Sequence, residues 1–233
     1  MSKLYHLIMI CILAMAALFS MVMSTAKGET RVAVIDGPLL HEESMNMSFK
    51  MCKKGHFDFN TQKPVVARAN DVHSYYVTNL ISQVAQRNDV CFVMLNVMGR
   101  NVKPGAIGKA IDLALKYKVK AVNISIVSTE LLESEKSAIK RALRRGVRIF
   151  VAAGNDSKNL NEVCNTYPAC YRIKHKNYKV VGAIDVYWQK AYYSNYGTMV
   201  NQWEFGEVGP LRGTSFASPR ALGLYLRGEK NGR

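Results

Sequence analysis

Residues 90–153 read VCFVMLNVMGRNVKPGAIGKAIDLALKYKVKAVNISIVSTELLESEKSAIKRALRRGVRIFVAA. Three continuous apolar runs in this segment are typical of strands buried on both faces, and they alternate with two stretches whose apolar residues recur at helical spacing. The strands are expected at residues 90–97, 121–127 and 147–153, and the helices at 106–118 and 134–145. Ser134 is a plausible cap for the second helix, and Gly146 is expected to end it. This alternation predicts an α/β fold, a doubly wound and mostly parallel sheet with helices on both faces.

The pattern extends toward both ends of the chain. An apolar run at residues 31–35 stops at Asp36 and a Gly-Pro turn, as a buried strand does. Residues 73–86 carry apolar side chains at helical spacing, and residues 179–184 form a further apolar strand. In parallel sheets of this type the active site lies beyond the carboxyl ends of the strands.

Composition agrees with one globular domain. The chain has 233 residues, of which 48% are hydrophobic and 21% charged, with 16 glycines, 6 prolines and 5 cysteines. An intrinsically disordered chain would be poorer in apolar residues, and a disulfide-dense mini-protein would be richer in cysteine. The glycine and proline content also excludes a collagen-like repeat.

The N-terminal 26 residues are set apart from the fold. Lys3 precedes an uncharged apolar run at residues 7–23, and small residues follow at positions 24–26. This order predicts a secretory signal peptide at 1–26 and one domain at 27–233, hence a secreted or periplasmic protein. The apolar run is long for a signal peptide, so an uncleaved membrane anchor remains the alternative.

Four cysteines lie beyond the signal segment. An even number in an exported protein suggests two disulfides, for which three pairings are possible. We favour Cys164–Cys170 as a local link and Cys52–Cys91 as a longer one. Four reduced, buried thiols are the alternative.

Four residues supply the groups that acyl transfer by a serine requires. That chemistry needs a hydroxyl, a base to take its proton, a carboxylate to orient the base, and donors for the oxyanion. Ser215 lies at a turn before a helix, His73 begins a helix, and Asp36 ends a strand. Asn155 follows another strand and can donate from its amide. Singly, such residues are more often turn, cap or surface residues, but the chain order Asp, His, Ser is one that hydrolytic triads use.

Four segments around these residues resemble the subtilisin-like serine proteases (subtilases). They are VAVIDGP at 32–38, HSYYVTNLI at 73–81, FVAAGND at 150–156 and GTSFASP at 213–219. The resemblance implies that Asp36, His73 and Ser215 form the catalytic triad and that Asn155 stabilises the oxyanion. AVNISIVS at 121–128 resembles a further family strand. On this basis the substrate would lie along Ser125, Ile126, Val127, Ala152, Ala153 and Gly154.

The departures from the family pattern lie close to the expected site. Gly37-Pro38 follows Asp36, and Ser74-Tyr75-Tyr76 follows His73, where the family has a different turn and a Gly-Thr-His sequence. Val127 replaces a family glycine, so a β-branched side chain should restrict the neighbouring pocket to small substrate side chains. These changes leave open a second interpretation, a catalytically inactive binding module that uses its basic surface to hold an acidic partner.

The charge predicts partners of a particular kind. The chain carries a formal net charge of +15, with basic residues concentrated at 136–148 and 172–179. Such runs are a solvated face or a surface for an acidic partner or an anionic surface. No motif indicates specific nucleic-acid binding. We expect a protein or peptide substrate, no metal and no cofactor, and the sequence leaves the oligomeric state open.

Overall fold

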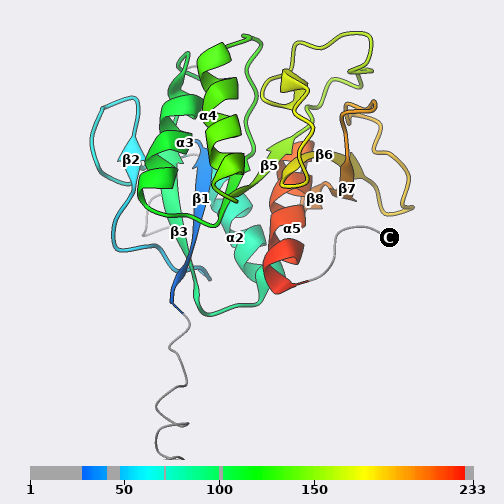
Figure 1. Ribbon diagram of the computed structural model, residues 1–233. Coiled ribbons are helices and arrows are strands. Elements are labelled where there is room, and N and C mark those ends of the chain that lie inside the picture. The colour runs from blue at the N-terminus through cyan, green and yellow to red at the C-terminus, as the bar shows by residue number, and fades with distance from the viewer. Residues whose placement is uncertain (1–27, 41–47, 71, 100–101, 229–233) are drawn as a thin grey trace, which may run out of the picture.

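The computed structural model describes residues 28–40, 48–70, 72–99 and 102–228, and the predicted signal peptide lies outside these residues. The described chain forms one sheet of seven parallel strands in the order β2-β3-β1-β4-β5-β6-β7 (Figure 1). The strands are β1 (Thr30–Asp36), β2 (Phe57–Asp58), β3 (Val90–Asn96), β4 (Ala121–Ile124), β5 (Arg148–Ala152), β6 (Tyr178–Ile184) and β7 (Gln202–Phe205).

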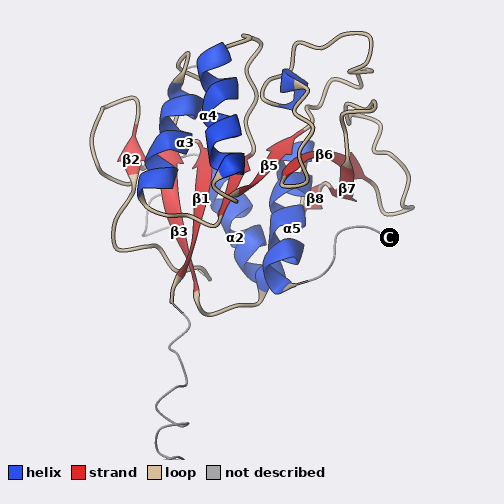
Figure 2. Cartoon of the chain, in the orientation of Figure 1, coloured by secondary structure: helices blue, strands red, loops and turns tan. Residues whose placement is uncertain are grey.

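Helices cover both faces of the sheet (Figure 2). α3 (Ala106–Lys116) and α4 (Glu133–Arg144) pack on one face, and α2 (His73–Ala85) and α5 (Thr214–Arg227) pack on the other. Two hydrophobic clusters result, one under each helix pair. The predicted doubly wound α/β architecture is confirmed.

Burial explains why the apolar runs became strands. All seven residues of β3 are buried, because helices lie above and below it, and a strand covered on both faces needs no polar alternation. The shorter pieces are the ribbon of β8 (Glu207–Val208) and β9 (Leu211–Arg212) and the 3₁₀ turn η2 (Ala169–Tyr171).

The expected cap of α4 is wrong. The helix begins at Glu133 after Leu132, and no side chain caps it, so Ser134 lies inside the first turn. The Leu132 carbonyl already accepts hydrogen bonds from the N–H groups of Glu135 and Lys136, which fixes the start of the helix earlier than Ser134 could. The end of α4 is as expected, because Gly146 has a positive φ of 79°.

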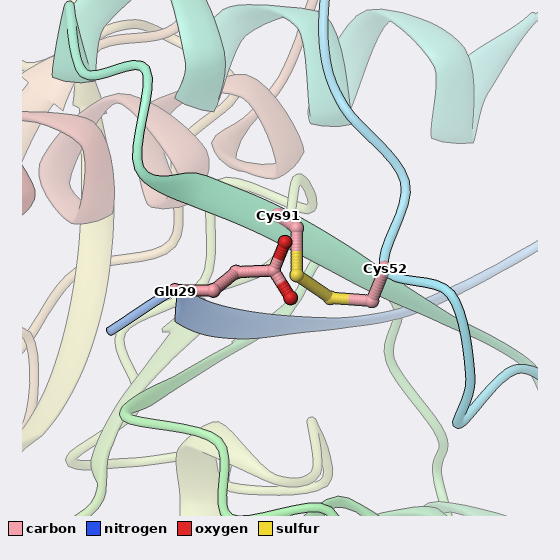
Figure 3. A group of neighbouring side chains, drawn as sticks. All are labelled: Glu29, Cys52 and Cys91. Carbon is pink, nitrogen blue, oxygen red and sulfur yellow. A yellow bond between two sulfur atoms is a disulfide. The ribbon is translucent and has the colours of Figure 1, made fainter. Parts of the chain in front are cut away.

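Two disulfides form, and they join the two pairs of cysteines that the sequence favoured. Cys52 is bonded to Cys91 in β3, and Cys164 to Cys170 in η2. Figure 3 shows the carboxylate of Glu29 beside the first disulfide, and among the described residues these three side chains are the one group close enough to suggest a metal site. The sulfurs are bonded to each other and therefore offer no thiolate ligand, and Glu29 lies 2.8 Å from Lys50 Nζ.

Candidate active site

Asp36 is the last residue of β1, a central strand between β3 and β4. Its side chain is 1% exposed. Oδ1 accepts a hydrogen bond from the N–H of Gly37 at 2.7 Å and lies 2.8 Å from Nδ1 of His73. Oδ2 is buried and has no hydrogen-bond partner among the described residues. A buried carboxylate with this contact can fix the orientation of an imidazole and stabilise its positive form.

His73 is the first residue of α2, and its ring is held on several sides. The ring is 32% exposed, and it packs against the ring of Phe216 with centroids 5.5 Å apart. Next to it, the buried hydroxyl of Ser74 donates a hydrogen bond to the carbonyl of Pro38. Ser74 and Pro38 are two of the departures from the family pattern, and this bond ties the turn after β1 to the first turn of α2. The two departures therefore contact each other and join the segments that carry Asp36 and His73.

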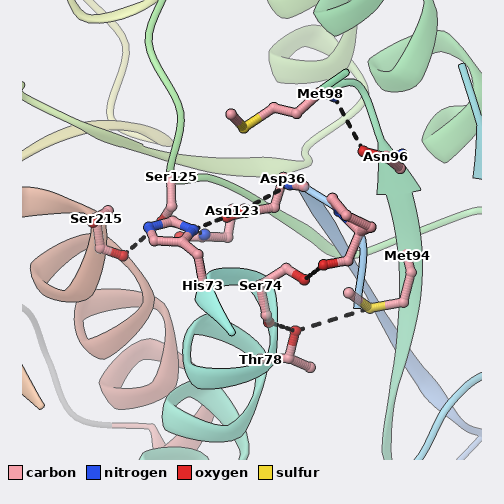
Figure 4. Close-up of polar contacts among 12 residues, drawn as sticks. Asp36, His73, Ser74, Thr78, Met94, Asn96, Met98, Asn123, Ser125 and Ser215 are labelled. Carbon is pink, nitrogen blue, oxygen red and sulfur yellow. Dashed lines mark hydrogen bonds and ion pairs between the residues drawn. The ribbon is translucent and has the colours of Figure 1, made fainter. Parts of the chain in front are cut away.

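Ser215 lies in the first turn of α5. In Figure 4 its hydroxyl points toward the His73 ring from the side opposite to Asp36. A buried polar chain fixes the position of this residue: Ser218 Oγ donates to Asn123 Oδ1, Asn123 Nδ2 donates to Ser125 Oγ, and Ser125 Oγ donates to the Ser215 carbonyl, each at 2.8 Å. Two of these bonds join β4 and the residue after it to the start of α5, and the third links Asn123 to Ser125, so this polar chain limits the movement of the Ser215 backbone.

Asn155 follows β5 and faces the start of α5. Its Oδ1 accepts hydrogen bonds from the N–H of Thr214 at 2.8 Å and from the Thr214 hydroxyl at 2.9 Å. With the oxygen engaged, Nδ2 has no acceptor among the residues that the structure describes and is the available donor. A Cβ added at Gly213 would lie 3.1 Å from both Asn155 Nδ2 and Ser215 Oγ, so the two groups border the same small space. An amide donor beside a serine hydroxyl suits an oxyanion that forms there.

A second asparagine fixes the loop that carries Asn155. Asn195 is fully buried, and its Nδ2 donates to the carbonyl of Ala153 at 3.0 Å. Its Oδ1 accepts from the N–H groups of Asp156 at 3.0 Å and Lys158 at 2.9 Å. One side chain therefore binds the backbone on both sides of Asn155. The sequence analysis missed this residue, because an asparagine in a polar loop gives no signal of burial.

The predicted substrate-binding segments extend from adjacent strands. β4 and β5 pair in parallel up to Ile124 and Val151. Residues 125–127 leave the ladder, and the chain pairs again at Ser128, which bonds with Tyr167. A segment that continues a strand and has no ladder partner among the described residues can receive a peptide backbone as an added strand. Val127, the last residue of this segment, is 43% exposed. Gly154 has a φ of 99°, and a side chain at this position would collide with Asn195.

The structure brings Asp36, His73 and Ser215 together and places Asn155 beside Ser215. Sequence reasoning missed the supporting residues Phe216, Asn123 and Asn195. One signal was visible, since Asn123 interrupts an otherwise apolar strand and a buried amide needs partners.

A comparison with protein families finds a match to the subtilase family over residues 64–225. The chain belongs to the subtilase family. The matched region includes His73, Asn155 and Ser215, and Asp36 lies before it.

Individual relatives are similar over part of their length. The chain is 34% identical over 99 residues to the subtilisin-like serine protease Rho m 2.0101 of Rhodotorula mucilaginosa, covering 37% of this chain and 27% of that protein. It is 35% identical over 124 residues to subtilisin-like protease 2 of Trichophyton rubrum, covering 47% and 28%. The matched regions thus span less than a third of these relatives.

Solved structures share the fold. A lanthipeptide protease superposes with a TM-score of 0.71 at 21% identity, covering 84% of this chain and 72% of that one. A cold-adapted subtilisin-like serine proteinase gives a TM-score of 0.66 at 24% identity, covering 89% and 80%.

Proposed function

We propose that this subtilase is an exported serine endopeptidase that cleaves peptide bonds through an acyl-enzyme. The observation that carries the proposal is the 2.8 Å contact between the buried carboxylate of Asp36 and Nδ1 of His73, with the Ser215 hydroxyl on the other side of the ring. Family membership supports the same reaction class.

The proposed mechanism assigns one proton path to His73. Its Nδ1 faces Asp36, so Nε2 takes the proton of Ser215 as Oγ attacks the peptide carbonyl carbon. The oxyanion receives hydrogen bonds from Asn155 Nδ2 and from the Ser215 N–H. His73 then gives the proton to the departing amine and the C–N bond breaks. A water molecule, deprotonated by His73, attacks the ester, and its proton returns to Ser215 as the acid leaves.

We propose peptide substrates that lie between residues 125–127 and 152–154. Their backbone would pair with the extended segment beyond β4, and Val127 would narrow the pocket for the side chain next to the cleaved bond. This arrangement favours small residues at that position.

Export rests on the predicted signal peptide at residues 1–26. Within the described residues no helix is long and apolar enough to cross a membrane, and the apolar run at 7–23 lies outside them. Cleavage of that segment would give a secreted or periplasmic enzyme, and its retention would give an anchored one. Two disulfides are compatible with an oxidising compartment.

Labelling with a fluorophosphonate probe tests the proposal. The purified protein should react, and the Ser215→Ala variant should not, because the probe needs an activated nucleophile. Sequencing of the labelled peptide should place the adduct at position 215. Absence of labelling in a protein with a cooperative thermal transition would contradict the proposal and favour the inactive binding module.

A further inference from the structure

The two basic runs of the sequence meet on one side of the molecule. Lys136, Lys140 and Arg144 lie on one face of α4, and the segment after η2 runs opposite them. Together they border a hollow of about 380 Å³. The lining comprises these three cations, Leu143 and residues 171–175. No acidic side chain is among these residues, and none of them belongs to the predicted triad or substrate segments.

Most of these cations have no acidic partner within the described part of the chain. Lys136 is the exception, because its Nζ lies 3.5 Å from Glu133. Lys140, Arg144, Arg172 and Lys174 are exposed, and their side chains form no hydrogen bond or ion pair with the described residues. Elsewhere on α4, by contrast, Arg141 forms an ion pair with Asp112 at 2.7 Å. Because these cations lie close together and most have no acidic neighbour among the described residues, the electrostatic potential in the hollow is positive. A positive potential favours a negatively charged ligand.

The walls of the hollow are fixed before any ligand arrives. Tyr171 is buried, and its hydroxyl donates a hydrogen bond to Glu135 of α4 at 3.0 Å. The disulfide between Cys164 and Cys170 holds the chain just before this tyrosine. A site whose backbone is already positioned loses less conformational entropy on binding.

The spacing of the cations suits an extended peptide. Residues four apart on a helix are about 6 Å apart along its axis, so the three cations of α4 form a row about 12 Å long. Alternate side chains of an extended peptide are about 6.7 Å apart and point the same way. Acidic residues at every second position would therefore meet successive cations.

We propose that this hollow, bounded by α4 and residues 171–175, docks an extended acidic peptide segment with Asp or Glu at alternate positions. The side chains between the acidic residues would point away from the hollow, since successive side chains of an extended peptide alternate in direction. This docking surface goes beyond the proposed catalysis, and binding to it does not require the Ser215 hydroxyl.

Fluorescence anisotropy of labelled peptides tests the docking surface. The full chain carrying Ser215→Ala is used, so that cleavage cannot remove the probe and failure of the proposed activity cannot affect the result. One peptide alternates glutamate and serine, and a second has the same composition with its glutamates in one block. We expect the alternating peptide to bind about fivefold more tightly, because its charges match the row on α4.

Two variants separate a local site from the net charge. Lys140→Ser, Arg144→Ser and Arg172→Asn together remove three cations of the hollow, and asparagine tolerates the left-handed φ of 54° at position 172. The control combines Lys54→Ser, Lys63→Ser and Lys116→Ser, which removes the same charge at exposed positions elsewhere. The first variant should bind the alternating peptide about tenfold more weakly, and the control should change little.

Three results would overturn the proposal. Equal weakening in both variants would mean that only the net charge matters. Equal affinity for the two peptides would show that the spacing of the acidic residues does not have to match the row of cations on α4. Binding to vesicles that contain phosphatidylserine, without binding to either peptide, would identify an anionic membrane surface as the ligand instead.

Discussion

At the scale of single residues, the role of Asn155 in catalysis can be tested separately from that of the triad. Its side chain is exposed, and its oxygen is bonded to Thr214, so its main free capacity is the Nδ2 donor. Asn155→Ala should lower kcat by about 10²–10³-fold and leave KM close to that of the unchanged protein, because the donor acts on the transition state. The melting temperature should fall only modestly, because the N–H and hydroxyl of Thr214 lose their acceptor. Steady-state kinetics on a peptide substrate and thermal unfolding check both parts. An unchanged kcat would remove Asn155 from the oxyanion site.

Val127 should determine which side chains fit next to the cleaved bond. It is 43% exposed at the end of the segment 125–127, and the family has glycine at this position. Val127→Gly should shift the preference from small residues toward aromatic ones by about 10- to 200-fold in relative kcat/KM, the range that small changes in pocket volume produce. A peptide-library profile of both proteins measures this shift. A preference for large aromatic residues in the unchanged protein would contradict the restricted pocket.

At the scale of elements, the loop after β5 depends on Asn195. Its side chain makes three hydrogen bonds to the backbone on both sides of Asn155. Asn195→Ala should therefore lower kcat through the position of Asn155 and also reduce the unfolding free energy by about 1–3 kcal/mol, since buried groups lose their partners.

A double-mutant cycle distinguishes positioning from general destabilisation. If Asn195 acts through Asn155, its substitution should lower kcat strongly alone and hardly at all in the Asn155→Ala background. Full additivity of the two effects on kcat, measured on folded protein, would make Asn195 a purely structural residue.

The elements differ in how far the sequence predicted them. β1, β3 and β5 are buried on both faces, so their composition alone marked them as strands. β7 has the sequence QWEF and lies at the edge of the sheet, where polar side chains are tolerated and no apolar run is needed. The start of α4 was misplaced because backbone bonds to the Leu132 carbonyl, rather than a side-chain cap, begin it. Motifs identified the four candidate site residues, but the bond between Ser74 and Pro38 joins positions far apart in sequence and needed coordinates.

At the scale of the whole molecule, one arginine joins both ends of the fold. Arg87, between α2 and β3, donates to the Leu226 carbonyl at the end of α5 at 3.0 Å and to Thr30 Oγ1 at the start of β1 at 3.1 Å. It also lies 2.6 Å from Asp89 Oδ2. Asp89 therefore holds in place a side chain that links the first strand to the last helix.

This pair gives the stability of the protein a defined dependence on pH. The hydrogen bond from Arg87 lowers the pKa of Asp89 from 3.8 to about 2. Because the folded state binds this proton less readily than the unfolded state, the pair stabilises the fold at pH values above 3.8, and the contribution disappears as the pH falls to about 2. Asp89→Asn should lower the unfolding free energy by about 1 kcal/mol at neutral pH, a value reduced for the partial exposure of the pair. The difference in unfolding free energy from the unchanged protein should shrink steadily in acid.

Urea unfolding at a series of pH values measures this difference. Asp112→Asn is the control, because Asp112 pairs with Arg141 on the exposed surface and its loss should cost little stability at any pH. A destabilisation by Asp89→Asn that persists undiminished in acid would show that the carboxylate charge is not what Arg87 requires.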